Sequence, residues 1–157
     1  MNKEDYILRI AQATPVQLVI ITNELMVAFI TEALDALKDS NIELFDHNIN
    51  KAKDALMQLI DGLDFENPIA QELYELYLYA NERLNKAFFA RDADSAQEIL
   101  EMFQNLLEGW VAIENTPDDR IAETLAEEAP QVFAGLTYGR DGLSEYIPED
   151  EGRGFKA

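Results

Sequence analysis

The only histidine of the chain, His47, is the first residue whose type suggests chemistry. A helical phosphotransfer protein needs one exposed histidine, and Lys51 lies one helical turn away. The phosphate would also need positive charge around it, but Asp46 is adjacent and Glu43 lies on the same side. A single histidine also excludes a ferritin-like di-iron site, which takes a Glu-x-x-His motif from each of two helices. We therefore favour a solvent-exposed histidine and keep phosphotransfer as an alternative.

Metal and thiol sites find little support in the sequence. The chain has no cysteine, which excludes disulfides, thiol catalysis and zinc–thiolate sites. Asp92 and Asp94 could open a calcium loop, but Gln97 and Phe103 stand where such a loop needs glycine and glutamate. An ordinary helix N-cap explains these residues better. Among 31 acidic residues, carboxylate pairs are no sign of acid–base catalysis. We expect no cofactor, no metal and no enzyme activity.

The net charge of −19 at pH 7 restricts the partners. Nucleic acids and anionic membranes both select Lys and Arg, so we expect neither as a partner. The charged N-terminus lacks the apolar core of a signal peptide. Charges are expected to interrupt every apolar run of the roughly 18 residues that a membrane span needs. We therefore predict a cytoplasmic protein.

Cap residues and apolar spacing predict an all-α chain. Thr14-Pro15 and Asn67-Pro68 each read as an N-cap followed by proline at the first helical position. Short connections require neighbouring helices to be antiparallel. The prediction is an antiparallel up-down four-helix bundle over residues 1–114, with its long helices at about 15–37, 44–63, 68–90 and 95–113, preceded by a short helix at 3–11.

Residues 115–157 form a predicted C-terminal extension of different composition. Thr116-Pro117 begins a short amphipathic helix that Pro130 ends, and an irregular acidic tail with glycines follows. A loosely packed tail is the default for a terminus. A second hypothesis is that the tail folds back into a groove of the bundle through its apolar residues, which include Phe133, Leu136, Tyr138, Leu143 and Tyr146.

The helix at 15–37 has more apolar residues than one core-facing stripe of about 100° needs. Leu18, Ile21 and Leu25 belong to that stripe, and further apolar residues lie on its flanks. The helix at 68–90 shows a milder excess. Exposed apolar patches mark binding sites, and a groove between helices binds an amphipathic segment. The predicted contacts are Val19, Ile20, Met26, Val27, Ile30, Tyr74 and Leu78. Internal cover by the N-terminal helix, or a dimer interface, is the alternative.

Three segments follow a known pattern in order and spacing. Residues 14–19 read TPVQLV, residues 50–56 read NKAKDAL, and residues 73–79 read LYELYLY, followed by Arg83, Leu84 and Ala87. Trp110 stands near the end of the last predicted long helix. Over about residues 5–114, these segments resemble the FliS family of flagellin-specific secretion chaperones.

The resemblance implies a helical bundle in the bacterial cytosol that binds the disordered C-terminal segment of flagellin. It implies that binding prevents premature polymerisation and aids delivery to a component of the flagellar export gate. In this family the N-terminal residues can cover the binding surface while it is empty, and Tyr6 is the expected N-terminal cap residue. The alternative function is a structural bundle that forms a homodimer and has no client.

Overall fold

The computed structural model describes residues 3–115. Within that range the elements are α1 (Lys3–Gln12), α2 (Pro15–Lys38), α3 (Ile42–Asp61), α4 (Ile69–Ala90) and α5 (Ala93–Glu114), and no strand is found among them. The predicted all-α class is confirmed, and the predicted helices differ from these by at most a few residues at each end. The predicted short helix after Thr116 and the tail after Pro130 lie outside the described residues. The division into 1–114 and 115–157 stays a prediction.

Local capping explains where the long helices begin. The Thr14 hydroxyl accepts a hydrogen bond from the Gln17 backbone N–H, and the Gln17 side chain accepts one from the Thr14 N–H. This reciprocal capping box satisfies N–H groups that the first helical turn leaves unpaired. Helix α4 departs from the prediction, because Pro68 takes the N-cap position with helical backbone angles and provides no side-chain cap.

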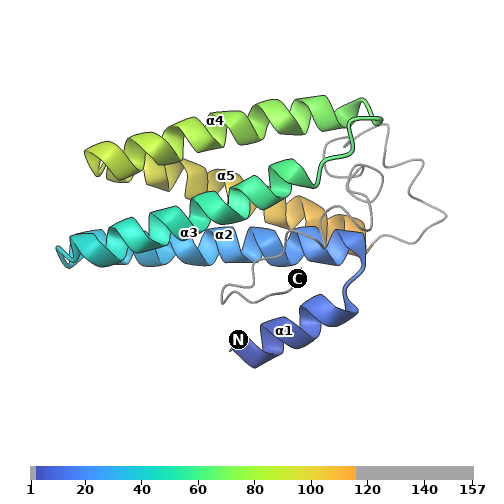
Figure 1. The fold of residues 1–157 in the computed structure, drawn as a ribbon, viewed down its shortest axis with the longest axis horizontal. Coiled ribbons are helices and arrows are strands. Elements are labelled where there is room, and N and C mark those ends of the chain that lie inside the picture. The colour runs from blue at the N-terminus through green and yellow to red at the C-terminus, as the bar shows by residue number, and fades with distance from the viewer. Residues whose placement is uncertain (1–2, 116–157) are drawn as a thin grey trace.

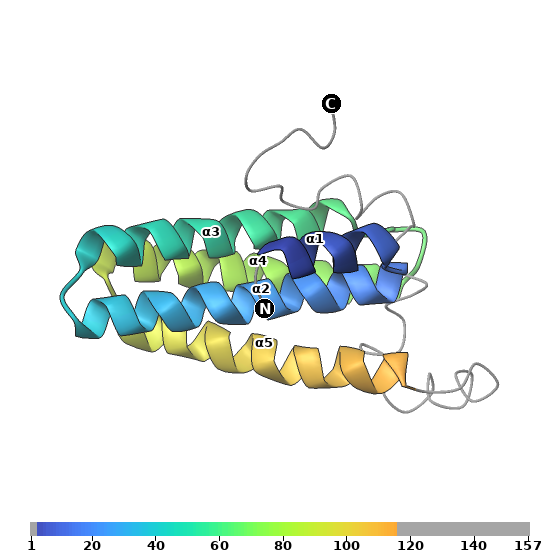
Figure 2. The ribbon, with the colours of Figure 1, turned by 90° about the horizontal axis from the view of Figure 1, so that it is seen from below.

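The four long helices lie side by side, and α1 lies outside them (Figures 1 and 2). Helix α2 packs against α3 and α5, and α4 packs against the same two helices. Their shared core contains the fully buried Phe45, Tyr77, Phe103 and Trp110. The rings of Tyr77 and Phe103 stack with centroids 6.2 Å apart, as expected for Tyr77, which the sequence assigns to the core.

Helix α2 is long and apolar enough to cross a membrane by length and composition. Glu24 nevertheless lies within every window of 18 residues in this helix, so that a charge interrupts its apolar run as expected. Half of its apolar window is buried inside the fold, and the core helix of a soluble protein meets the same criterion. Its buried Thr22 and Asn23 donate hydrogen bonds to the carbonyl oxygens of Leu18 and Val19, which reduces the cost of burying them.

Candidate functional site

The apolar excess of α2 is covered by the protein itself. Residues 18–23 are six consecutive buried residues, and six steps of about 100° take in the whole circumference of a helix. Four predicted contacts are 0–3 % exposed and belong to the core: Val19, Ile20, Met26 and Ile30. The prediction that these four side chains are accessible is wrong, because α3, α5 and α1 together surround this part of α2. Val27 is half-buried.

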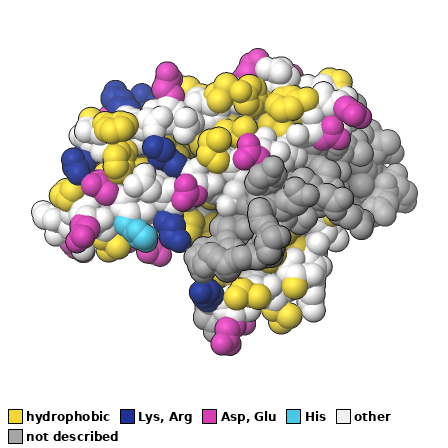
Figure 3. Space-filling view, in the orientation of Figure 1, with side chains coloured by type: hydrophobic (Ala, Val, Ile, Leu, Met, Phe, Trp, Pro, Cys, Tyr) yellow, Lys and Arg dark blue, Asp and Glu magenta, His cyan; other side chains and the backbone are white. Residues whose placement is uncertain are grey.

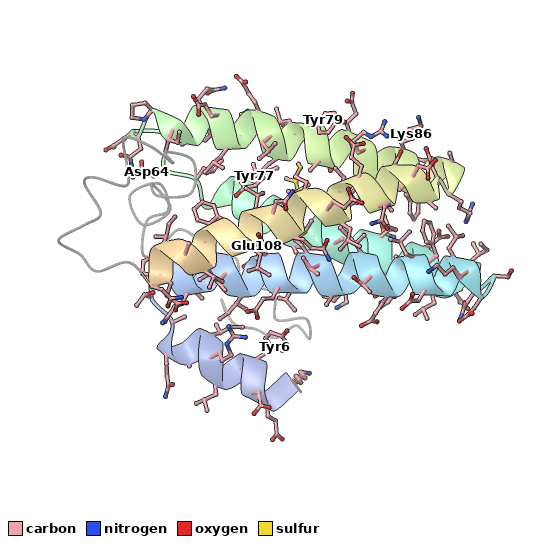
Figure 4. All side chains as sticks on the ribbon, turned by 180° about the vertical axis from the view of Figure 1, so that it is seen from behind. Tyr6, Asp64, Tyr77, Tyr79, Lys86 and Glu108 are labelled. Atoms are coloured by element: carbon pink, nitrogen blue, oxygen red, sulfur yellow. The ribbon has the colours of Figure 1, made fainter. Side chains whose placement is uncertain are left out.

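Helix α1 covers α2 without a core of its own. None of its residues is buried, and Ile7 and Leu8 are exposed. The Arg9 guanidinium donates to both carboxylate oxygens of Glu24 on α2, at 2.7 and 3.3 Å. Figure 4 shows Tyr6, the predicted N-terminal cap residue, pointing from α1 toward α2. The Arg9 guanidinium lies 5.8 Å from the Tyr6 ring centroid.

Electrostatics around Tyr6 match this position between the helices. Partial burial raises the pKa of the Tyr6 hydroxyl, and the nearby Glu24 carboxylate raises it further. The Glu24 carboxylate also accepts from Arg9 and raises the pKa of that guanidinium. Arg9 therefore stays charged and Tyr6 stays neutral at physiological pH, so that the contacts of α1 do not depend on pH in that range.

Ile21 forms an apolar surface beneath α1. It is 1 % exposed but lies outside the continuous core cluster. Together with Arg9, Gln12, Gln17 and Glu114 it lines a pocket of about 350 Å³, and the Gln17 side-chain amide donates to the Glu114 carboxylate at 3.0 Å. Since two of the five lining residues come from α1, the cover over Ile21 depends on that helix.

The outer surface of α4 is open where that of α2 is covered. Leu78 is 43 % exposed, and Tyr74, one turn earlier, is half-buried. The Tyr74 ring meets the exposed Phe65 edge-on, with centroids 5.4 Å apart. Helix α3 adds the exposed Met57, which lies one turn after Lys53 on the face of α3 that turns toward α4. These four residues, Met57, Phe65, Tyr74 and Leu78, are named the apolar strip.

Figure 3 shows apolar side chains gathered along α4 on this face of the molecule. The sequence predicted Tyr74 and Leu78 as surface contacts but missed Met57 and Phe65. Two signals were available: Met57 falls off the core stripe of its helix, and Phe65 stands in an acidic connection between Asp64 and Glu66. Tyr79, on the α5 side of α4 (Figure 4), instead donates to the Glu98 carboxylate, which raises the pKa of its hydroxyl.

The residues that suggested chemistry in the sequence can be placed in the described part of the chain. The described residues contain no group of three His, Asp or Glu side chains that could hold a metal ion. His47 is exposed, as a solvated histidine would be, and the nearby Arg91 guanidinium is paired with Asp46 at 2.8 Å. Asp92 accepts hydrogen bonds from the Asp94 N–H and the Ser95 hydroxyl, which confirms the N-cap interpretation of this segment.

Comparison with known families agrees with this description. The family described as "Flagellar protein FliS" matches residues 3–117, from the start of α1 to just beyond the end of α5. No curated protein matches the chain. The members of this family are chaperones and are not known as enzymes. Because the match covers well over half of the 157 residues, the chain belongs to the FliS family and has a chaperone role in the flagellar system.

Proposed function

We propose that this protein is a cytoplasmic export chaperone that binds the disordered C-terminal segment of flagellin. Binding keeps flagellin from polymerising before export and presents it to a component of the export gate. Helices α2 to α5 act as an antiparallel up-down four-helix bundle in this role. The observation that supports the proposal best is Ile21, a buried apolar side chain outside the core cluster that lines a pocket with Arg9 and Gln12 of α1, a helix without any buried residue.

In this proposal the client displaces α1 from the outer surface of α2. The Arg9–Glu24 pair is about one-third exposed on each side, and ion pairs at such positions contribute about 0–1 kcal/mol. This ion pair therefore adds little to the cost of displacing α1, which also includes the loss of the packing of Ile10 against the core. A client that places apolar side chains on Ile21 gains about 25 cal/mol per Å² of buried apolar area, before the cost of ordering the client is subtracted.

The apolar strip is the second proposed contact, and it lies on a different helix pair. Since α2 and α4 occupy opposite positions among the four long helices, a single short helix cannot contact both Ile21 and Leu78. The client must therefore wrap around the bundle in more than one segment. Of the predicted contact residues, Val27, Tyr74 and Leu78 remain accessible enough for this role.

A matched pair of variants in the full-length chain tests the proposal. Ile21→Asp places a carboxylate on the proposed binding surface, and Leu8→Asp places one on the exposed outer side of α1. Calorimetric titration with a flagellin C-terminal peptide, under conditions where circular dichroism shows both variants to be fully folded, is expected to show at least a tenfold weaker affinity for Ile21→Asp, equal to about 1.4 kcal/mol. Leu8→Asp is expected to bind like the wild type. Equal affinities for Ile21→Asp and wild type would overturn the proposal.

The alternative is a homodimer formed through the apolar strip, which the exposure of Met57, Phe65 and Leu78 favours. Light scattering over a range of concentrations, with and without the peptide, distinguishes the two functions. A chaperone gains the mass of the peptide on binding, and its own number of subunits either stays the same or falls. A structural dimer does not bind the peptide, and its mass therefore stays the same.

A further inference from the structure

Basic side chains are concentrated in one part of this very acidic molecule. Five of the twelve Lys and Arg residues belong to α3 and the last half of α4 and its C-cap: Lys51, Lys53, Arg83, Lys86 and Arg91. Figure 3 shows dark blue side chains toward the left, where α3 begins and α4 ends, interspersed with magenta Asp and Glu side chains. Three of the five pair with carboxylates: Arg83 with Glu98, Lys86 with Asp92 and Arg91 with Asp46. The segment 83–91 contains no acidic residue.

An exposed aromatic pair lies at the same place. Phe89 is 75 % exposed, the highest value among the large apolar side chains of the described range. Its ring meets that of Phe88 edge-on, with centroids 5.0 Å apart, and the Lys53 ammonium lies 5.5 Å from the Phe88 centroid. No ion pair joins Lys53 to a carboxylate of residues 3–115. Lys53, Phe88 and Phe89 are named the basic–aromatic end.

The apolar strip and the basic–aromatic end are two parts of one face. Met57 follows Lys53 by one turn on α3, and Tyr74 and Phe88 lie on the same side of α4 because fourteen residues make almost four turns. The apolar strip lies at the end of the molecule where α4 begins and α5 ends (Figures 1 and 2). This α3–α4 face therefore runs from the apolar strip, near the end of α5, to the basic–aromatic end, where no carboxylate of residues 3–115 pairs with Lys53.

The chain after α5 has a complementary order of residues. Residues 116–157 contain ten Asp and Glu and four Lys and Arg residues. The apolar residues from Phe133 to Tyr146 come first, and the acidic run Glu149-Asp150-Glu151 follows. We propose that residues 131–151 dock on the α3–α4 face of their own chain, with the apolar part on the apolar strip and the acidic run at the basic–aromatic end.

The lengths allow this docking. Tyr74 and Phe88 are separated by about 21 Å along α4, at 1.5 Å per residue. The thirteen residue steps from Tyr138 to Glu151 span about 20 Å as a helix and about 43 Å when fully extended. The segment from Asn115 to Phe133 adds ample chain to reach the apolar strip. Both contacts can therefore form at once.

A tethered segment fits this face better than an acidic segment from another protein. The net charge of −19 repels a free acidic partner at distances up to about the Debye length, roughly 8–10 Å in physiological salt. A segment attached to the same chain is held at an effective concentration in the millimolar range. Tethering thus offsets the repulsion, and the charge of Lys53 then acts at short range, whereas Lys86 and Arg91 are already paired with Asp92 and Asp46.

Docking has a regulatory consequence that rests on the proposed function. The tail would occupy Tyr74 and Leu78 until a client replaces it, while Ile21 beneath α1 stays independent of the tail. The docking itself requires no client. The docking proposal can therefore be wrong while the flagellin peptide still binds. It can also be right while the peptide does not bind.

Distance measurements between two spin labels in the full-length chain test the proposal without a client. Because the chain has no cysteine, Asn85→Cys on the α3–α4 face and Gly152→Cys in the tail provide two unique labelling sites. We expect a narrow population of short distances that does not depend on protein concentration. Raising the salt concentration should reduce this population.

Charge variants supply the control. Lys53→Glu combined with Lys86→Glu should remove most of the short-distance population, and so should neutralising Glu149, Asp150 and Glu151 together. Lys3→Glu combined with Lys38→Glu changes the net charge by the same amount at positions away from the α3–α4 face. This control should leave the short-distance population unchanged. A broad distribution that none of these variants alters would overturn the proposal. Short distances that appear only at high concentration would also overturn it, because they would indicate contact with a second copy.

Discussion

Helices α2 and α4 both have apolar side chains beyond a single core-facing stripe, but the two helices differ in how many neighbours cover them. Helix α2 contacts α3, α5 and α1, whereas α4 contacts α3 and α5. Val19, Met26 and Ile30 are therefore sealed in the core, while Leu78 stays exposed. An apolar circumference alone does not reveal an open surface. The accessibility of these side chains depends on how many other helices pack against the helix.

The comparison also separates two kinds of binding surface. In the proposed function, the surface of α2 at Ile21 becomes accessible when α1 leaves, whereas the apolar strip beside α4 is accessible in the structure as it stands. The same substitution should therefore affect stability on one helix and binding on the other.

An aspartate in the covered part of α2 should unfold the protein. Met26 is fully buried among the long helices, and an uncompensated buried charge costs about 3–5 kcal/mol, against a total stability of about 5–15 kcal/mol. We expect Met26→Asp to lower the melting temperature strongly or to abolish folding, as measured by circular dichroism. Leu78→Asp on α4 should change the free energy of unfolding by less than about 0.5 kcal/mol. Equal effects would contradict the comparison.

The same α4 variant should weaken client binding. Burial of the exposed part of a leucine side chain contributes about 1 kcal/mol, which corresponds to a roughly fivefold change in affinity. We expect Leu78→Asp to weaken binding of the flagellin peptide at least fivefold, measured by titration under conditions where it is fully folded. Val111→Asp on the exposed side of α5 is the control and should bind normally. A normal affinity for Leu78→Asp would remove the apolar strip from the binding surface.

The helices themselves could be predicted because their signals are local. Thr14 with Gln17, and Asp92 with Ser95, form their caps within three residues of the chain. Whether an apolar residue is buried depends on tertiary packing, and a short stretch of sequence does not contain that information. The position of α1 over Ile21 therefore could not be predicted, and four of the seven expected contacts turned out to be core residues. Tyr74 and Leu78 were found because, among the described helices, α4 packs closely only against α3 and α5.

Weakening the contact between α1 and α2 should have a smaller effect than Leu78→Asp. It should raise the affinity for the peptide, whereas Leu78→Asp lowers it. Arg9→Ala removes the ion pair with Glu24 and should cost no more than about 1 kcal/mol. We expect faster hydrogen exchange in α1 and an affinity for the peptide up to about fivefold higher, because the client then displaces a weaker cover. Lys3→Ala, at the start of α1, is the matched control. Unchanged exchange in α1 would show that other contacts hold it in place.

Acid should distinguish the start of α2 from the connection between α4 and α5. The neutral hydroxyl of Thr14 caps α2, whereas the Asp92 carboxylate caps α5. The Ser95 hydroxyl, by its hydrogen bond, lowers the pKa of Asp92, with further contributions from the backbone N–H groups of Ser95 and Asp94 and from Lys86. The folded state thus favours the ionised form, so this contribution to stability is complete above the unfolded pKa of about 3.9.

It is lost as the pH falls below that value and through the lower folded pKa. In thermal melts between pH 6 and pH 2, Asp92→Asn should therefore lose less stability than the wild type below about pH 4. Thr14→Ser should follow the wild type at every pH, since its cap does not titrate. Parallel curves for Asp92→Asn and wild type would mean that the amide and the carboxylate cap α5 equally well, and that acid acts on this fold through its other carboxylates.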